Sequence, residues 1–204
     1  MAKNLCETVI SACIGANCEN TIYSGVEQIG YIANFADVAT FHQSNTNGSI
    51  IDSITMKTDT VGSEEVAKCW YKIQQLGNRP FEGSQTEFVE GTYMNRVTNT
   101  IQFAVLDNGP EVTENVIDKL LNGKFVVILE NDFVHENGDN KYSIYGSKKG
   151  LKCTGLTREL YGDNESAWIV TLVEENAAKS GMFVYATDEQ ATDAMIESLV
   201  CNCD

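Results

Sequence analysis

The sequence predicts a mainly β domain of the α+β class, a β-sandwich or barrel with one flanking helix, hairpin extensions and a C-terminal helix. Residues 125–129 are apolar at every position, as in a strand buried on both faces. Apolar and polar residues alternate in the long stretch 93–106, which indicates a second strand, and 168–173 form another apolar run. Helical spacing of apolar residues at 110–121 predicts the flanking helix.

This helix has recognisable ends. Asn108-Gly109 forms a turn, and Pro110 stands at the first helical position, where proline is tolerated. Gly123 is expected to close the helix in a left-handed conformation. The apolar residues that share one helical face are Val112, Val116, Ile117, Leu120 and Leu121.

The N-terminal half before this helix contains further strands. Residues 26–33 are expected to form a strand, and 38–42 and 49–56 a hairpin, because Asn47-Gly48 supplies the positive φ angles of a hairpin turn. A polar loop is expected at 58–65. Two further segments are expected to be strands. They are 66–76, where the residues alternate as in a sheet with one more solvent-exposed face, and 86–90.

After the buried strand, the chain continues through turns and short strands. The exposed hairpin tip at 132–140 and the turn at 146–150 separate the expected strands 141–145, 151–156 and 182–185. Residues 187–190 (Thr-Asp-Glu-Gln) have the form of a capping box, so a helix follows, with Ala191, Ala194, Met195 and Leu199 as its apolar positions. The expected organisation is an N-terminal arm (1–25), a β-sandwich domain (26–186) and a C-terminal helix and tail (187–204).

The chain is strongly acidic. Its 204 residues carry 29 acidic and 14 basic side chains, a formal charge of −15. Such a surface repels nucleic acid and anionic membranes, so specific binding to either is not expected. Like charge is also what a wall needs if DNA is to pass along it without adsorbing. No apolar run has the length of a secretory signal or a membrane span.

Seven cysteines without a recognisable signal peptide favour reduced thiols. The terminal residues Cys13, Cys18, Cys201 and Cys203 are conceivable zinc ligands, but their spacings match zinc knuckles poorly. Small buried or surface thiols are the favoured interpretation, and the sequence assigns no role to Cys6 or to these four residues.

No catalytic constellation is evident. The two histidines, His42 and His135, each lie at an expected hairpin without a recognisable nucleophile motif beside them. The Gly-Ser-Lys-Lys-Gly sequence at 146–150 lacks the phosphate-loop spacing, and the acidic tip at 132–140 departs from the calcium-loop pattern. We therefore expect neither an enzyme nor a bound cofactor or metal.

Three stretches, with a fourth in support, resemble major tail (tail-tube) proteins of phages, especially those of phages and prophages of gut Bacteroidetes. They are Tyr-Ile-Ala-Asn-Phe at 31–35, the long strand leading into helix 110–121, and Lys-Tyr-Ser-Ile-Tyr-Gly at 141–146 continuing to Gly150-Leu151. The segment 167–175 supports the likeness, which covers most of residues 26–185. The cysteine-bearing ends are not part of it.

The resemblance implies a β-sandwich that assembles into rings, commonly hexameric, which stack into the tube through which the genome leaves the virion. Its implied partners are further copies of itself and other tail proteins, with DNA passing unbound and no membrane involved. The subunit would be made in the bacterial cytoplasm and reside in the virion tail. Candidate assembly residues in the hairpin region are Phe35, Phe41, His42, Ile50 and Ile54; candidate acidic residues of the lumen are Glu82, Glu87 and Glu90.

Two other classes stay open on the sequence. One is a different assembly protein with a similar β core, such as a head-tail joining or capsid-decoration protein, or a tube subunit of a contractile injection apparatus. The other is a small acidic metal- or ligand-binding module that uses the terminal cysteines. The sequence does not distinguish contractile from non-contractile tails, or assign the ring symmetry, the lumen face or the host.

Overall fold

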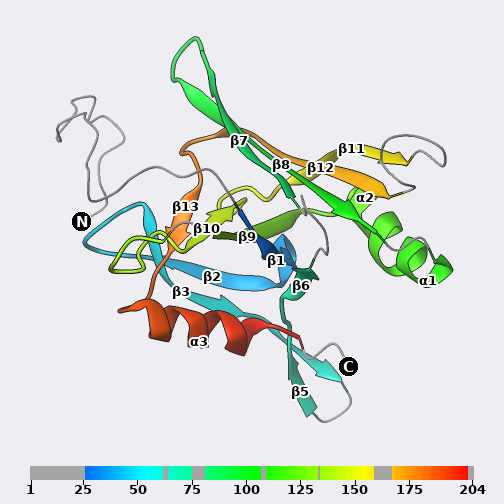
Figure 1. The fold of residues 1–204 in the computed structure, drawn as a ribbon, viewed down its shortest axis with the longest axis horizontal. Coiled ribbons are helices and arrows are strands. Elements are labelled where there is room, and N and C mark those ends of the chain that lie inside the picture. The colour runs from blue at the N-terminus through cyan, green and yellow to red at the C-terminus, as the bar shows by residue number, and fades with distance from the viewer. Residues whose placement is uncertain are drawn as a thin grey trace.

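The protein is described from a computed structural model covering residues 26–61, 64–74, 81–106, 109–132, 134–158 and 167–201. It is mainly β, as the sequence predicts, with two large sheets and flanking helices. A long helix, α3, lies on one side of the larger sheet, and the smaller sheet lies on the other side (Figure 1). The fold is thus a β-sandwich with helices packed against it.

The described residues form thirteen strands and five helical segments. The strands are β1 (Val26–Asn34), β2 (Val38–Gln43), β3 (Ile50–Met56), β4 (Thr58–Val61), β5 (Glu64–Ala67), β6 (Tyr71–Gln74), β7 (Phe81–Val89), β8 (Arg96–Val105), β9 (Phe125–Asn131), β10 (Tyr142–Tyr145), β11 (Lys152–Arg158), β12 (Trp168–Ala177) and β13 (Met182–Val184). The helical segments are η1 (Phe35–Asp37), α1 (Pro110–Val112), the π-helical turn η2 (Thr113–Ile117), α2 (Asp118–Asn122) and α3 (Glu189–Leu199).

The larger sheet has seven strands in the order β2-β3-β13-β10-β9-β1-β6, and the smaller has four in the order β11-β12-β8-β7. Neighbouring strands are antiparallel in both sheets except for the pair β13–β3. The segment 58–67, expected to begin as a polar loop, instead forms the two-stranded hairpin β4–β5. Its threonines and Val66 suit a strand, and this local preference is enough for an exposed hairpin.

Strand β9 shows why its sequence is apolar throughout. Val126 and Ile128 face the core beneath α3, whereas Phe125, Val127 and Leu129 face the core between the two sheets. All five side chains are at most 4% exposed. Because side chains alternate along a strand, a strand between two cores must be apolar on both faces.

The helical segment 110–122 forms as predicted, but only part of its apolar face is buried. Ile117 and Leu120 are buried, whereas Val116 and Leu121 are 39% and 51% exposed. The expected left-handed cap at Gly123 is wrong, because this residue has φ −82° and ψ 170°. Glycine is required there for space: a Cβ would overlap the Phe125 ring.

Helix α3 begins one residue later than the capping box suggests. The Asp188 carboxylate accepts a hydrogen bond from the Ala191 amide at 2.7 Å, so Asp188 is the N-cap. Ile196 and Thr192 are its buried residues, while Ala194 is exposed. The predicted helix is confirmed, and its core-facing stripe is centred on Ile196 instead of Ala194.

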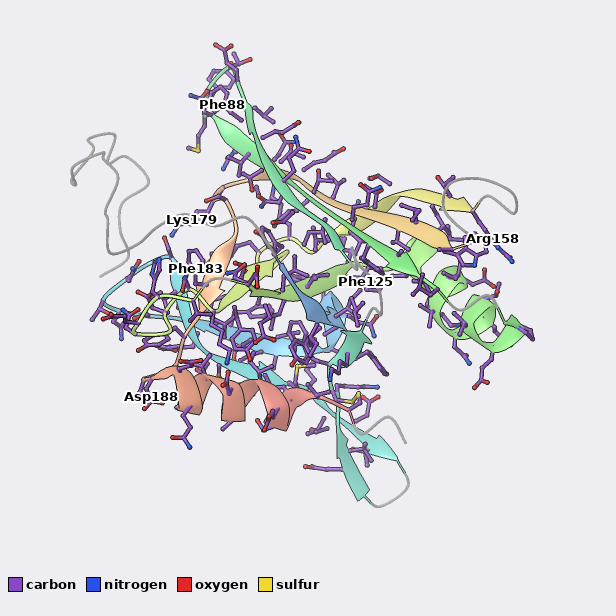
Figure 2. All side chains as sticks on the ribbon, viewed as in Figure 1. Phe88, Phe125, Arg158, Lys179, Phe183 and Asp188 are labelled. Atoms are coloured by element: carbon purple, nitrogen blue, oxygen red, sulfur yellow. A yellow bond between two sulfur atoms is a disulfide. The ribbon has the colours of Figure 1, made fainter. Side chains whose placement is uncertain are left out.

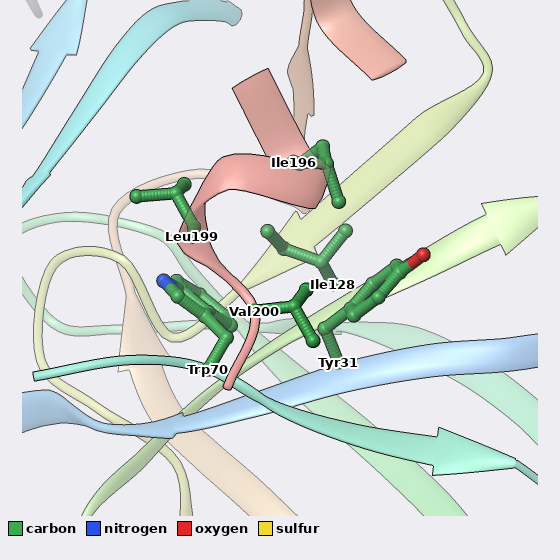
Figure 3. A pocket seen from close by; sticks show the side chains of 6 residues that line it. All are labelled: Tyr31, Trp70, Ile128, Ile196, Leu199 and Val200. Atoms are coloured by element: carbon green, nitrogen blue, oxygen red, sulfur yellow. The ribbon is translucent and has the colours of Figure 1, made fainter. Parts of the chain in front are cut away.

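The C-terminal end of α3 packs on the larger sheet around Trp70 (Figure 3). The Trp70 amide donates to the Leu199 carbonyl at 2.8 Å, and the Cys201 amide donates to the Trp70 carbonyl at 2.8 Å. The space enclosed by the side chains shown is too small to admit a water molecule. This region is therefore packed core, and no ligand fits there.

An ionic cluster fastens the other end of α3 to the sheet. The Lys141 ammonium lies 2.8 Å from Asp193, 3.1 Å from Glu189 and 3.9 Å from Glu130. The Tyr142 hydroxyl donates to Asp193 at 2.8 Å. Burial opposes the charge on Lys141, but hydrogen bonds to Asp193 and Glu189 raise its pKa.

We expect this cluster to make the protein sensitive to alkali. Burial raises the pKa of Tyr142 well above 10.0, with help from its bond to Asp193, and burial together with the Glu130 charge raises that of Tyr31. Above about pH 10 the unfolded chain releases these protons while the folded chain keeps them. Above about pH 10.5 the unfolded chain also releases the Lys141 proton, which the folded chain keeps. The free energy of unfolding should then fall by up to about 1.4 kcal/mol per pH unit for each group.

Urea denaturation between pH 8 and 11 measures this effect. In the wild type, the free energy of unfolding decreases as the pH rises. Tyr142→Phe removes one titrating proton and should make this decrease smaller by about 1.4 kcal/mol per pH unit. Tyr93→Phe is the matched control, because the Tyr93 side chain is 99% exposed. Equal slopes for both variants and wild type would contradict the assignment.

Candidate functional site

Strands β7 and β8 continue beyond the larger sheet as a projecting hairpin, defined here as residues 86–98 (Figure 1). Phe88 pairs with Val97, two residues along β8 from Asn99, and so lies on the core-facing side of the sheet. Phe88 is nevertheless 68% exposed, because no layer covers that side among the described residues (Figure 2). The hairpin therefore presents an uncovered inner face.

The tip of this hairpin is also apolar. Tyr93 is 99% exposed and Met94 is 48% exposed. Gly91 has a steric role in the turn, since a Cβ there would overlap the Met94 carbonyl oxygen. Exposed aromatic and methionine side chains at the end of a projecting element are typical of contacts with another protein.

A cleft of about 820 Å³ lies at the base of the hairpin. Three turns form its walls: 44–48 between β2 and β3, 146–149 between β10 and β11, and 178–181 between β12 and β13. The Lys179 ammonium donates to the Gly48 carbonyl at 2.6 Å and so joins two of these turns. The Tyr145 and Ser84 hydroxyls lie 2.8 Å apart and connect the two sheets beside the cleft.

Buried polar residues make up part of the cleft floor. Asn99 is 1% exposed and Glu174 is 5% exposed. The Asn99 side-chain amide donates to the Glu174 carboxylate at 3.2 Å and to the Lys179 carbonyl at 3.3 Å. Thr86 in turn donates to the Asn99 amide oxygen at 2.8 Å. Both the nitrogen and the oxygen of the Asn99 side-chain amide are hydrogen-bonded, and these bonds connect β7, β8 and the 178–181 turn.

A bulge in β12 shapes the same region. The pairing of β12 with β8 shifts register between Glu174 and Ala177, and Asn176 has φ 53°. Asparagine tolerates this left-handed conformation better than most residues. A bulge bends a strand, and here it precedes the turn that forms one wall of the cleft.

The cleft is basic in a protein that is strongly acidic overall. Lys148, Lys149 and Lys179 stand on its walls with exposed side chains, and the one carboxylate among its lining residues is the buried Glu174. The Lys149 ammonium donates to the Asn176 carbonyl at 2.6 Å. The cleft therefore presents positive charge around a partly apolar floor.

The outer face of the four-stranded sheet, turned away from the larger sheet, is polar but nearly neutral. Its positions follow from the register and from the inward placement of Ile101, Phe103 and Leu172. They include Gln85, Glu87, Thr98, Thr100, Gln102, Ala104, Lys152, Thr154, Thr157, Ile169, Thr171, Val173 and Glu175. The edge strands of this sheet are β7 and β11.

The candidate assembly residues of the β2–β3 region contribute mostly to the core. Ile54 is 7% exposed, and Phe35, Phe41 and Ile50 are partly buried, the two phenylalanines against the core beneath α3. His42 is exposed and lies 2.6 Å from Asp52. The exposed apolar surface lies instead on the projecting hairpin, where the sequence pointed only to the acidic residues Glu87 and Glu90.

The three candidate lumen residues fall at different places. Glu87 is exposed on the outer face of the four-stranded sheet and accepts a hydrogen bond from Gln85 at 2.7 Å. Glu90 is exposed in the turn at the hairpin tip. Glu82 belongs to β7, but its side chain lies outside the described residues.

The expectation that the cysteines are reduced is wrong for two of them. Cys69 and Cys201 form a disulfide across a sequence separation of 132 residues. The backbone pairing of Trp70 with the end of α3 places them together, with Cα atoms 5.2 Å apart. Cys201 is therefore unavailable as a zinc thiolate, and the other proposed ligands, Cys13, Cys18 and Cys203, lie outside the described residues, as do Cys6 and the N-terminal arm.

One histidine outside the cleft forms a surface pair. His135 and Asp139 are 3.0 Å apart on the β9–β10 connection, separate from the cleft lining. Within the described ranges, no three histidine, cysteine or acidic side chains gather closely enough to hold a metal ion. The expectation that the protein is not an enzyme stays a prediction.

Comparison of the chain with protein-family models, with curated proteins and with solved structures finds no match. In the described part of the chain, every helix is too short or too polar to cross a membrane.

Proposed function

We propose that this chain is a structural subunit of a phage tail tube, whose copies join into rings that stack into a conduit for DNA. The observation that carries the proposal is the four-stranded sheet, which leaves β7 and β11 unpaired on opposite edges within the described structure. A β-sheet edge offers its free backbone groups to a strand of another molecule.

The strand directions suit a closed ring. Because the order β11-β12-β8-β7 is antiparallel throughout, β7 and β11 run in opposite directions. A copy related by rotation about a ring axis would place its β11 antiparallel to β7 of its neighbour. Repetition of this heterologous contact gives a continuous antiparallel sheet that closes on itself.

The outer face of the four-stranded sheet would then line the lumen. Its threonine and glutamine side chains, with Glu175 against Lys152, give DNA phosphates little to bind. Glu87 and Arg96 share this face of the sheet but belong to the projecting hairpin, beyond the wall. The excess acidity of the chain, −15 per subunit, acts in the same direction. A neutral to acidic wall permits passage without adsorption.

The disulfide is consistent with a subunit that resides in the virion. Disulfides persist in oxidising surroundings, including the surfaces of virions, and are rare in proteins that remain in the cytoplasm. A subunit made in the bacterial cytoplasm and released in a particle would form the Cys69–Cys201 bond after release. The bond then stabilises a protein that must survive without its host.

Proline substitution on the edge strand tests the ring proposal. Adjacent residues of β7 direct their backbone amides alternately toward β8 and toward the open edge. Of Ser84→Pro and Gln85→Pro, each compared with alanine at the same position because Ser84 also bonds Tyr145, one should therefore lower the melting temperature, and the other should keep it. The variant that keeps it should fail to form rings, because proline removes a donor from the edge alone.

Sedimentation velocity across a concentration series gives the assembled mass, and Ser84→Ala and Gln85→Ala serve as the controls that retain the backbone amide. Loss of assembly in the thermally stable proline variant supports edge pairing. Rings of unchanged mass in that variant would show that the β7 edge is not the ring contact.

A further inference from the structure

The cleft and the hairpin tip are complementary in charge, and both carry apolar surface. The cleft offers an opening of about 820 Å³ with three exposed lysines on its walls. The tip offers Tyr93 and Met94 together with the carboxylate of Glu90, and Glu87 stands on β7 just before the tip. Arg96 is the one basic residue of the hairpin. Apolar side chains with acidic neighbours are what a basic, partly apolar cleft should accept.

The tip of the same molecule cannot fill the cleft. Tyr93 is six residues beyond Asn99, so an extended hairpin holds it up to about 20 Å from the cleft floor. Both strands of the hairpin are paired as far as Val89 and Arg96, which prevents it from folding back. The occupant must come from another molecule.

We infer that the projecting hairpin of a second copy of this chain docks in the cleft, with its acidic tip among Lys148, Lys149 and Lys179. Phe88 and Val97 of the receiving copy extend the apolar surface from the cleft along the inner face of its own hairpin. This inference rests on the proposed ring and assigns its second contact, between neighbouring subunits, beside the β7–β11 edge.

The contact is directional. Each copy supplies one tip and one cleft, so the interaction can pass from subunit to subunit around a ring. It also accounts for exposed aromatic surface on an otherwise polar hairpin, since docking removes Tyr93 and Met94 from water. Burial of such side chains supplies most of the binding energy at protein interfaces, whereas the charges fix the orientation and exclude wrong pairings.

A charge-exchange experiment tests the inference on the full chain. The tip variant carries Glu87→Lys and Glu90→Lys, and the cleft variant carries Lys148→Glu and Lys149→Glu. In either variant alone, tip and cleft have like charge. In an equal mixture, a reversed tip meets a reversed cleft and a native tip meets a native cleft, so every contact in an alternating assembly is attractive again.

We expect each variant alone to require at least about tenfold more protein for half-maximal assembly than wild type, and the mixture to recover to within about threefold of wild type. Sedimentation velocity provides the readout, and thermal melting verifies that each variant is folded. Matched controls carry the same number of charge changes on exposed residues outside the cleft and the β7 and β11 edges. Glu65→Lys with Glu197→Lys, and Lys57→Glu with Lys72→Glu, should assemble like wild type.

The outcomes separate this contact from the ring proposal. If both variants form rings at the same protein concentration as wild type, the docking is overturned and the ring proposal remains. Exchange-dependent association that stops at a dimer would support the docking and overturn the ring. A wild-type protein that stays monomeric at every concentration would overturn both.

Discussion

Replacing both Cys69 and Cys201 by serine should lower the free energy of unfolding by about 4–5 kcal/mol. The disulfide joins residues separated by 132 positions, and closing so long a loop restricts the unfolded chain strongly. The bond also holds the C-terminal end of α3 against the Trp70 region, where the backbone pairing is limited to two hydrogen bonds. Its loss affects both the unfolded chain and the packing of α3.

Urea denaturation with and without a reducing agent measures this effect. The wild type should lose stability on reduction, and the double serine variant should be indifferent to it. Cys153→Ser is the matched control, because Cys153 is the free cysteine of the described chain and packs in the other core. Equal stability of wild type and double variant under oxidising conditions would contradict the assigned role of the bond.

Truncating either of two adjacent residues in β9 should lower the free energy of unfolding by about 2–5 kcal/mol. Ile128 and Leu129 are both 1% exposed, but they face different cores. Ile128→Ala should open a cavity beneath α3, close to Trp70, as Figure 3 shows for the intact side chains. Leu129→Ala should open one between the two sheets.

Tryptophan fluorescence distinguishes the two cavities. Ile128→Ala should shift the emission of Trp70 in the folded state, and Leu129→Ala should leave it near the wild-type value, with Trp70→Phe identifying the signal. The milder substitutions Ile128→Val and Leu129→Val, combined, should have nearly additive effects, because the two side chains pack in different cores. Strong coupling between them would show that the two cores are not independent.

Much of the fold could be predicted where a local pattern determines the structure. The apolar stretch of β9 and the helix after residue 187 each depend on neighbouring residues alone. The β2–β3 hairpin is confirmed, but the positive φ angles expected at Asn47-Gly48 are wrong, because neither residue has one. Burial is harder to predict. Val116 and Leu121 have the spacing of a core face, but the helix contacts the sheet through a narrower stripe around Ile117 and Leu120.

The candidate site depends on contacts that sequence patterns do not carry. Its cleft is formed by turns near residues 46, 148 and 180, which only the strand order brings together. The disulfide likewise joins residues far apart in the chain. Strand β7 is longer than expected, because an exposed strand of the projecting hairpin needs no apolar alternation. One signal was present: Tyr93 and Met94 are large apolar residues in an otherwise polar turn.

Negative-stain electron microscopy of the oxidised wild-type protein at increasing concentration, with its mass from light scattering, tests the central claim most directly. The proposal predicts rings with a central hole at moderate concentration and stacked tubes of constant diameter at higher concentration. A monomer at every concentration, with the disulfide formed and the protein folded, would contradict the assignment of this chain as a tube subunit.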